Sequence, residues 1–177
     1  MKLFWTIALL LPFSLMGQLV TSSQSPAALV QNTLLGTGDT VSNINFTGFS
    51  WAIGRFTANG TNLGINSGIV ITTGTIANNG NGPHGPNNKS NSGVDNNYPG
   101  FSSLTAIAGA PTHDASILEF DFIPYADTVR FKYVFGSEEY PEYVGRGFND
   151  AFAIFVSGPG ISGNVNIAKL PNYSNIT

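Results

Sequence analysis

The strongest constraint on the fold is a two-residue alternation of apolar and polar side chains in the second half of the chain. The apolar positions are Leu118, Phe120 and Phe122 in one run, and Val129, Phe131, Tyr133 and Phe135 in the next. Because successive side chains of a β-strand point to opposite faces, each run buries one face of a strand. Residues 124–127, Pro-Tyr-Ala-Asp, separate the runs and favour a turn. The pattern predicts an antiparallel hairpin, in which Glu119 and Asp121 face the basic residues 130 and 132.

Shorter segments with the same period lie on either side of this hairpin. They cover residues 44–46, 51–56, 69–73, 148–157 and 165–170, and most are bounded by Gly, Asn or Pro. Short strands at regular spacing are typical of β-sandwiches and barrels. We therefore expect an all-β fold, a jelly-roll-like antiparallel β-sandwich.

One short N-terminal helix is expected before the strands, over residues 25–36. Ser25 suits the N-cap, Pro26 suits the first helical position, and Gly36 suits the end of the helix. The apolar side chains of this segment, Leu29 among them, fall close to one helical face. We interpret it as a packing helix.

A long segment rich in Asn, Gly and Pro covers residues 76–103. Loops of more than about 15 residues inside a compact domain are uncommon, and they are usually either functional or disordered. Both interpretations stay open for this segment. Its few residues with chemistry are His84, Lys89, Asp95 and Tyr98.

The composition excludes several classes of function. Charged residues make up 10% of the 177 residues, against about 25% in ordinary soluble domains, and the net charge is −3. Such a chain has no basic surface for nucleic acid. It has no cysteine, which excludes disulfides, a thiolate nucleophile and a sulfur-based metal site. A eukaryotic secreted domain would more often carry a disulfide, so a bacterial envelope or exterior is favoured.

Residues 1–17 have the pattern of an export signal. Lys2 gives a positive start, an apolar run follows to Met16, and Gly17 precedes the cleavage point. The run is short for a membrane span, although an uncleaved membrane anchor is the alternative. We expect residues 1–17 to be a signal peptide and residues 18–177 to form one domain.

An acidic turn lies between two apolar segments, within the run GSEEYPEYVGRGFNDAFAIFVSGPG of residues 136–160. Eight of the ten acidic residues of the chain fall between Asp114 and Asp150. Carboxylate and amide oxygens suit Ca²⁺, which takes six to eight oxygen ligands. The expected ligands are Glu138, Glu139, Glu142, Asn149 and Asp150, with Asp121 or Asp95 as further candidates. The alternative is a solvated acidic loop in which Asp150 makes backbone hydrogen bonds in a turn.

The same turn supports two further hypotheses. A pair such as Glu138 and Asp150 would suit glycoside hydrolysis if the carboxyl groups lie about 5 to 10 Å apart. The chain has no nucleophile elbow, zinc-binding helix or phosphate loop, so an enzyme is the less favoured interpretation. Tyrosines near the turn and in the Asn-rich segment are candidates for stacking on sugar rings, although Tyr is equally common on β-surfaces. These tyrosines are Tyr98, Tyr140 and Tyr143.

The run FGSEEYPEYVGRGFNDAFAIFVSGPG resembles the choice-of-anchor L domain of bacterial exported proteins. Other stretches agree with that family: LVQNTLLGTGDTVSNINFTG, AIGRF, LGINSGIVITTG and DASILEFDFIPYADTVRFKYVF. The resemblance implies a secreted or surface-displayed module of adhesin-like proteins, often from bacteria with type IX secretion and gliding motility. It implies no assigned enzymatic activity. Such proteins are often attached by C-terminal sorting signals, which we do not find here. We therefore expect a domain truncated at its C-terminal end, with an unknown route to the surface as the alternative.

The expected role is therefore non-catalytic adhesion or display, steadied by calcium at the acidic turn. A calcium-dependent carbohydrate-binding module and a hydrolase with paired carboxylates are the alternatives. The expected partner is an extracellular glycan or a surface protein, with no nucleic acid. Contact with a membrane is expected only through export or through an anchor that this chain does not contain.

Overall fold

The computed structural model describes residues 19–35, 40–58, 60–76, 95–137, 146 and 149–177. Its strands form three antiparallel sheets, so the all-β prediction is confirmed. The first sheet has the order β1 (Val20–Ser22), β3 (Ile53–Thr57) and β4 (Ser67–Ile71). The second pairs β2 (Thr40–Thr47) with β5 (Ile117–Ile123), and the third pairs β6 (Phe155–Gly158) with β7 (Ile161–Asn166).

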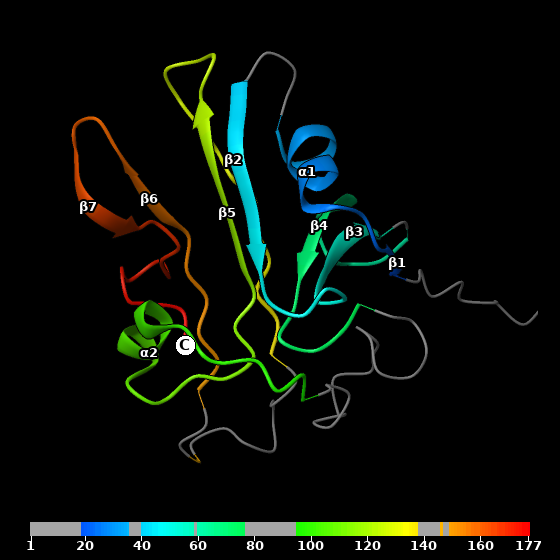
Figure 1. Cartoon of the computed structure of the whole chain (residues 1–177), viewed down its shortest axis with the longest axis vertical. Coiled ribbons are helices and arrows are strands. Elements are labelled where there is room, and N and C mark those ends of the chain that lie inside the picture. Colours follow the sequence, from blue (N-terminus) through cyan, green and yellow to red (C-terminus); the bar gives the residue numbers. More distant parts are fainter. Residues whose placement is uncertain (1–18, 36–39, 59, 77–94, 138–145, 147–148) are drawn as a thin grey trace, which may run out of the picture.

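Figure 1 shows how these sheets are placed. The β2–β5 ribbon stands in the centre, with the β1–β3–β4 sheet and the N-terminal helix on one side of it. The β6–β7 hairpin, the second helix and the C-terminus lie on the other side. A jelly-roll sandwich stays a prediction, because the described strands belong to three separate sheets.

The N-terminal helix forms as expected. Helix α1 (Pro26–Leu29) continues directly into one π-helical turn, η1 (Val30–Leu34). Ser25 caps it, since its side-chain oxygen accepts a hydrogen bond from the amide of Ala28 at 3.3 Å. Helix α1 packs against β2 and β3, and η1 packs against β4.

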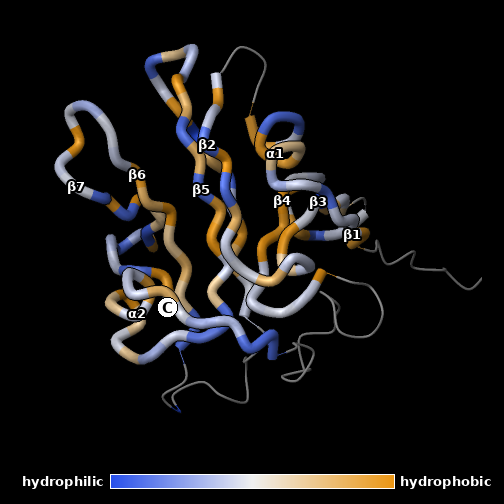
Figure 2. Tube along the Cα trace, viewed as in Figure 1, coloured by the Kyte–Doolittle hydropathy of each residue, from blue (hydrophilic) through white to orange (hydrophobic). Residues whose placement is uncertain are grey.

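The main core lies between this helix and the first sheet. Leu29 and Val30 are fully buried, and so is Ile53 of β3 apart from 2% of its surface. Figure 2 shows apolar residues on α1, β3 and β4, which lie next to one another, and further apolar residues along β2 and β5. The other buried apolar residues of this region are Ala52, Phe56, Ala58 and Ile76. Burial of this apolar surface is the main force that holds helix and sheet together.

The predicted partner of strand β5 was wrong. The alternating run 117–123 is a strand, but it pairs with β2, from Thr40 opposite Ile123 to Thr47 opposite Ile117. Residues 129–135 form no strand. Alternation fixes which face of a strand is buried, not which strand lies beside it, and β2 carries the same alternation. The hairpin that would place Glu119 and Asp121 opposite residues 130 and 132 is therefore not formed by the described residues. Asp121 instead accepts a hydrogen bond from the side-chain amide of Asn43 on β2 at 2.6 Å.

The C-terminal strands are also placed differently from the expectation. Strand β6 covers only the end of the predicted segment 148–157, and Phe152 makes an isolated bridge with Ile176. Residues 159–160 form a tight turn, so β7 begins at Ile161 and not at residue 165. Gly160 has a φ of +82°, a backbone conformation that glycine adopts without strain.

A second helix, α2 (Ser102–Ala108), corrects the expectation of a single helix. It starts inside the segment predicted to be a loop. Gly109 ends it in the left-handed conformation, with a φ of +71°, and donates its amide to the carbonyl of Thr105. Gly109 followed by Pro111 is a helix stop signal that the sequence did contain.

Candidate functional site

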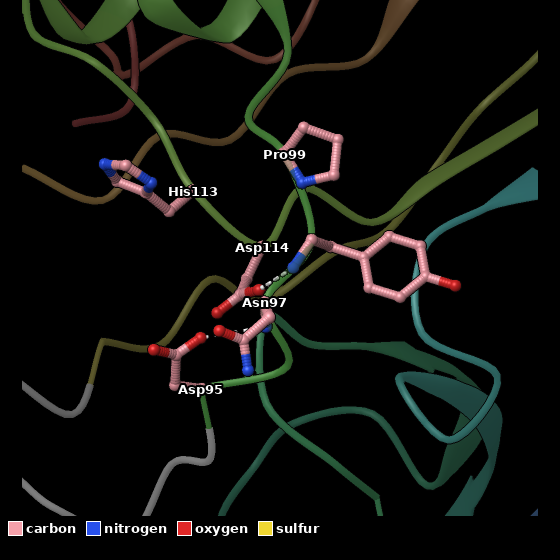
Figure 3. Close-up of a pocket in the computed structure, with 6 residues that line it drawn as sticks. Asp95, Asn97, Pro99, His113 and Asp114 are labelled. Atoms are coloured by element: carbon pink, nitrogen blue, oxygen red, sulfur yellow. Dashed lines mark hydrogen bonds between the residues drawn. The ribbon is translucent and has the colours of Figure 1, made fainter.

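The structure forms an open polar cavity of about 540 Å³ between two segments, residues 95–99 and 113–114, and most of its lining residues are exposed. The first segment precedes α2, and the second lies between α2 and β5. An antiparallel bridge between Pro99 and His113 holds the two segments side by side. The lining residues are Asp95, Asn97, Tyr98, Pro99, His113 and Asp114, and Figure 3 shows them.

Asp114 is the residue that joins the two segments. One of its carboxylate oxygens accepts the amide of Tyr98 at 2.8 Å, and the other accepts the amide of Asn96 at 3.2 Å. Its own amide donates to the carbonyl of Tyr98 at 2.9 Å. The residue holds a positive φ of +51°, which Asp tolerates better than most residues. Asp114 therefore acts as a clamp on the backbone of the first segment.

Asn96 fixes the cavity to the first sheet. Its side-chain nitrogen donates to the carbonyls of Thr73 and Gly74, at 2.7 and 2.8 Å, just after the end of β4. Ser116 makes a similar link, since its hydroxyl donates to the carbonyl of Thr72 at 2.8 Å. The cavity is therefore connected to the sheet that carries the main core.

Several polar groups in the cavity remain available to a ligand. Asp95 uses one carboxylate oxygen to accept the amide of Asn97 at 2.8 Å. Within the described residues, the other oxygen of Asp95, the side-chain amide of Asn97 and the ring of His113 make no hydrogen bond. Together these groups can both donate and accept hydrogen bonds. The lining includes two carboxylates and no lysine or arginine, so the cavity has negative character.

Tyr98 is the one predicted ligand-binding residue that the structure places at this cavity. Its ring lies 6.5 Å from that of Phe49 at an angle of 59°, and the residue is 38% exposed. The other two predicted tyrosines, Tyr140 and Tyr143, lie outside the described residues.

The predicted calcium site is only partly described. Glu138, Glu139 and Glu142 lie outside the described residues. Asp150 accepts a hydrogen bond from the hydroxyl of Ser137 at 2.6 Å, and Asn149 donates its amide to the carbonyl of Ala108 at 3.2 Å. The hydrogen bond found at Asp150 is thus to a side chain, whereas the alternative interpretation predicted bonds to the backbone. The described residues contain no group of three or more His, Cys, Asp or Glu that would hold a metal ion.

Sequence reasoning missed most of this cavity. The sequence marks Asp95 as a residue with chemistry in the Asn-rich segment and as a further calcium candidate, but it does not connect His113 or Asp114 with residues 95–98. Helix α2 separates residues 95–99 from residues 113–114 in the sequence. Nothing in the residue pattern shows that these two segments lie side by side in the fold. A usable signal was present in Asp95-Asn96-Asn97, since Asp and Asn tolerate positive φ and bond to nearby backbone groups.

The sequence of the chain matches the model of a known protein family over most of its length. The Choice-of-anchor L domain matches residues 18–177. The chain belongs to the Choice-of-anchor L domain family. No curated protein and no solved structure matched the chain.

Membership in the Choice-of-anchor L family implies an exported or cell-surface protein, and domains of this family are typically non-catalytic. In the described part of the chain, no helix has the length and apolar character needed to cross a membrane. The match begins at residue 18, directly after the segment with the pattern of an export signal.

Proposed function

We propose that the chain is a non-catalytic module for adhesion or display, secreted or held at a bacterial cell surface. The observation that carries this proposal is the match of residues 18–177 to the Choice-of-anchor L domain. Its partner is an extracellular glycan or a surface protein. Type IX secretion, in bacteria with gliding motility, is the proposed route to the surface, and a jelly-roll-like sandwich is the proposed complete architecture.

The cavity supports a binding role over a catalytic one. Both oxygens of Asp114 already accept backbone amides, so this carboxylate is occupied in holding the loop. A retaining or inverting glycosidase needs two carboxyl groups that can act on substrate. Asp95 is the other carboxylate of the lining, and it retains one uncommitted oxygen.

Surface labelling of intact cells tests the first half of the proposal. Cells that express the whole chain are treated with a membrane-impermeant amine-reactive biotin reagent, with a cytoplasmic protein as the control for leakage. We expect the chain to be biotinylated on intact cells or recovered from the medium. Labelling only after lysis would refute export.

An adhesion assay tests the second half. The exported chain is coated on a surface and presented with glycans and with extracellular proteins, and hydrolysis of glycosides is measured in parallel. We expect retention of at least one ligand class without turnover. Turnover that Asp150→Asn abolishes in a folded protein would instead favour the hydrolase.

Calcium-dependent carbohydrate binding is the second candidate function. The observation behind it is the set of uncommitted hydrogen-bonding groups on Asp95, Asn97 and His113, which a sugar could engage. The calcium would be held by the acidic turn at residues 138–150. Addition of a chelator during the adhesion assay separates this candidate from calcium-independent binding.

A further inference from the structure

We propose that the cavity between residues 95–99 and 113–114 binds a neutral saccharide by direct hydrogen bonds to its hydroxyl groups. This inference rests on the proposed binding function and names the ligand class for this cavity. It assigns the contacts to Asp95, Asn97 and His113, and it assigns a positioning role to Asp114.

The chemistry of the lining selects a neutral ligand with many hydroxyl groups. An anionic ligand would be repelled by the two carboxylates, since the lining has no lysine or arginine. An apolar ligand would bury the free oxygen of Asp95 and the amide of Asn97 without partners, which is costly. Sugar hydroxyls both donate and accept, as this mixed set of groups requires.

A cation fits the cavity less well than a saccharide. Asp114 has both oxygens engaged by the amides of Asn96 and Tyr98, which leaves Asp95 with the uncommitted anionic oxygen. Within the residues that the structure covers, no three acidic or histidine side chains come together as metal ligands. The side-chain amide of Asn97 also offers donors, which a cation does not need.

The polar side chains of the cavity lie close to one another. In Figure 3 the carboxylate of Asp95 and the ring of His113 lie on the same side of the segment, with the carboxylate of Asp114 between them. Pro99 also lines the cavity, but its ring lies on the other side of the segment in this view. A ligand on the side of Asp95 and His113 therefore meets mainly polar groups, which suits a sugar with several hydroxyl groups.

The cavity is held in shape before a ligand arrives. Asn97 and Asp114 both have positive φ angles, +55° and +51°, and such conformations persist only where the surroundings enforce them. Here the surroundings are the Asp114 clamp, the Pro99–His113 bridge and the anchor of Asn96 on Thr73. A preformed site loses less conformational entropy when it binds.

The test uses the whole chain purified from cells that export it. An array of neutral and anionic glycans is screened first, and the best neutral ligand is then titrated by calorimetry with and without EDTA. We expect binding to neutral glycans that is unchanged by EDTA. Binding only to anionic glycans, or binding that EDTA abolishes, would overturn direct recognition in this cavity.

Two variants and one matched control locate the site. Asp95→Asn keeps an oxygen that accepts the backbone amide of Asn97, but it removes the negative charge. Asn97→Gly removes the side-chain amide, and glycine adopts the positive φ of this position without strain. Each is expected to weaken binding about 5- to 10-fold, as for the loss of one hydrogen bond. Asp127→Asn makes the same chemical change beyond the opposite end of β5 and is expected to leave affinity unchanged. Equal losses in Asp127→Asn and Asp95→Asn, in folded proteins, would place binding elsewhere.

The remaining outcomes separate this inference from the proposed function. A chain that is surface-exposed and adheres to proteins, but binds no glycan, refutes the saccharide inference and leaves the adhesion module standing. A chain that is neither exported nor adhesive refutes the proposed function. Circular dichroism and thermal unfolding of each variant show whether a loss of binding reflects a loss of fold.

Discussion

Gly100, directly after the first segment of the cavity, lies against the backbone of Thr112, directly before the second segment. A Cβ atom at this residue would lie 1.8 Å from the carbonyl oxygen of Thr112, a distance that only a shift of backbone would relieve. The glycine is therefore required for packing, because only a residue without a side chain fits against the opposite backbone.

The variant Gly100→Ala is expected to lower the free energy of unfolding by about 2 kcal/mol or more, since the added methyl overpacks a backbone contact. Urea denaturation of the exported chain measures this value. The matched control is Gly136→Ala, where the added Cβ meets nothing within 4 Å, and its stability is expected to stay within about 0.5 kcal/mol of the original. Equal effects of the two changes would contradict the close approach.

At the residue scale the sequence identified parts of the cavity but not their assembly. Tyr98 and Asp95 were each named for chemical character, which the sequence displays directly. The sequence does not link His113 and Asp114 to them. These residues become neighbours only because the chain reverses direction around α2, and because the side chain of Asp114 bonds to the backbone of the first segment. Such bonds form only after the fold has brought the groups together.

Strand β2 contains the clearest irregularity among the strands. Asn43 has a φ of +53° at the point where the register with β5 shifts, between Ser42 and Asn45. Its side chain donates to Asp121 on β5 at 2.6 Å, so the bulged residue still links the two strands.

Substitutions at Asn43 can separate backbone strain from this hydrogen bond. Asn43→Gly and Asn43→Ala both remove the bond to Asp121, but only Gly adopts the positive φ without strain. We expect Asn43→Ala to be less stable than Asn43→Gly by about 1 kcal/mol. The difference in urea midpoint between the two purified variants measures it, and an Ala variant as stable as the Gly variant would argue against a left-handed residue here.

The elements also show where periodicity is informative. The alternation at residues 117–123 predicted a strand, and β5 covers the same residues. The predicted partner was wrong because the paired residues of β2 lie 70 to 83 positions earlier in the chain, and a local pattern carries no information about such a distant pairing. The N-terminal helix was predicted well because its cap, Ser25, and its proline, Pro26, are local signals.

For the molecule as a whole, stability depends on the core between α1 and the first sheet. Leu29→Ala is expected to reduce the free energy of unfolding by about 3 kcal/mol, since this side chain is completely buried. Leu34→Ala is the matched control, because Leu34 is 37% exposed and its truncation is expected to cost clearly less. Thermal and urea unfolding of both variants give the comparison. A similar loss in the two would contradict the placement of the core.

Calcium binding by the acidic turn is tested on the whole exported chain by thermal unfolding in excess Ca²⁺ and in chelator. A site filled at 100 times its dissociation constant adds about 2.7 kcal/mol, which raises the unfolding temperature by roughly 5 to 10 °C. Asp150→Asn is expected to abolish the rise while it keeps an acceptor for the hydroxyl of Ser137. Coincident curves for the original chain would leave Asp150 with its hydrogen-bonding role alone.

The hydrogen bond from Ser137 to Asp150 joins two residues that lie 13 positions apart in the chain. A contact between residues so distant in sequence reports on tertiary structure and not on local conformation. A pair of spectroscopic labels at these two positions would therefore follow the unfolding of this part of the chain without any change to the core around α1.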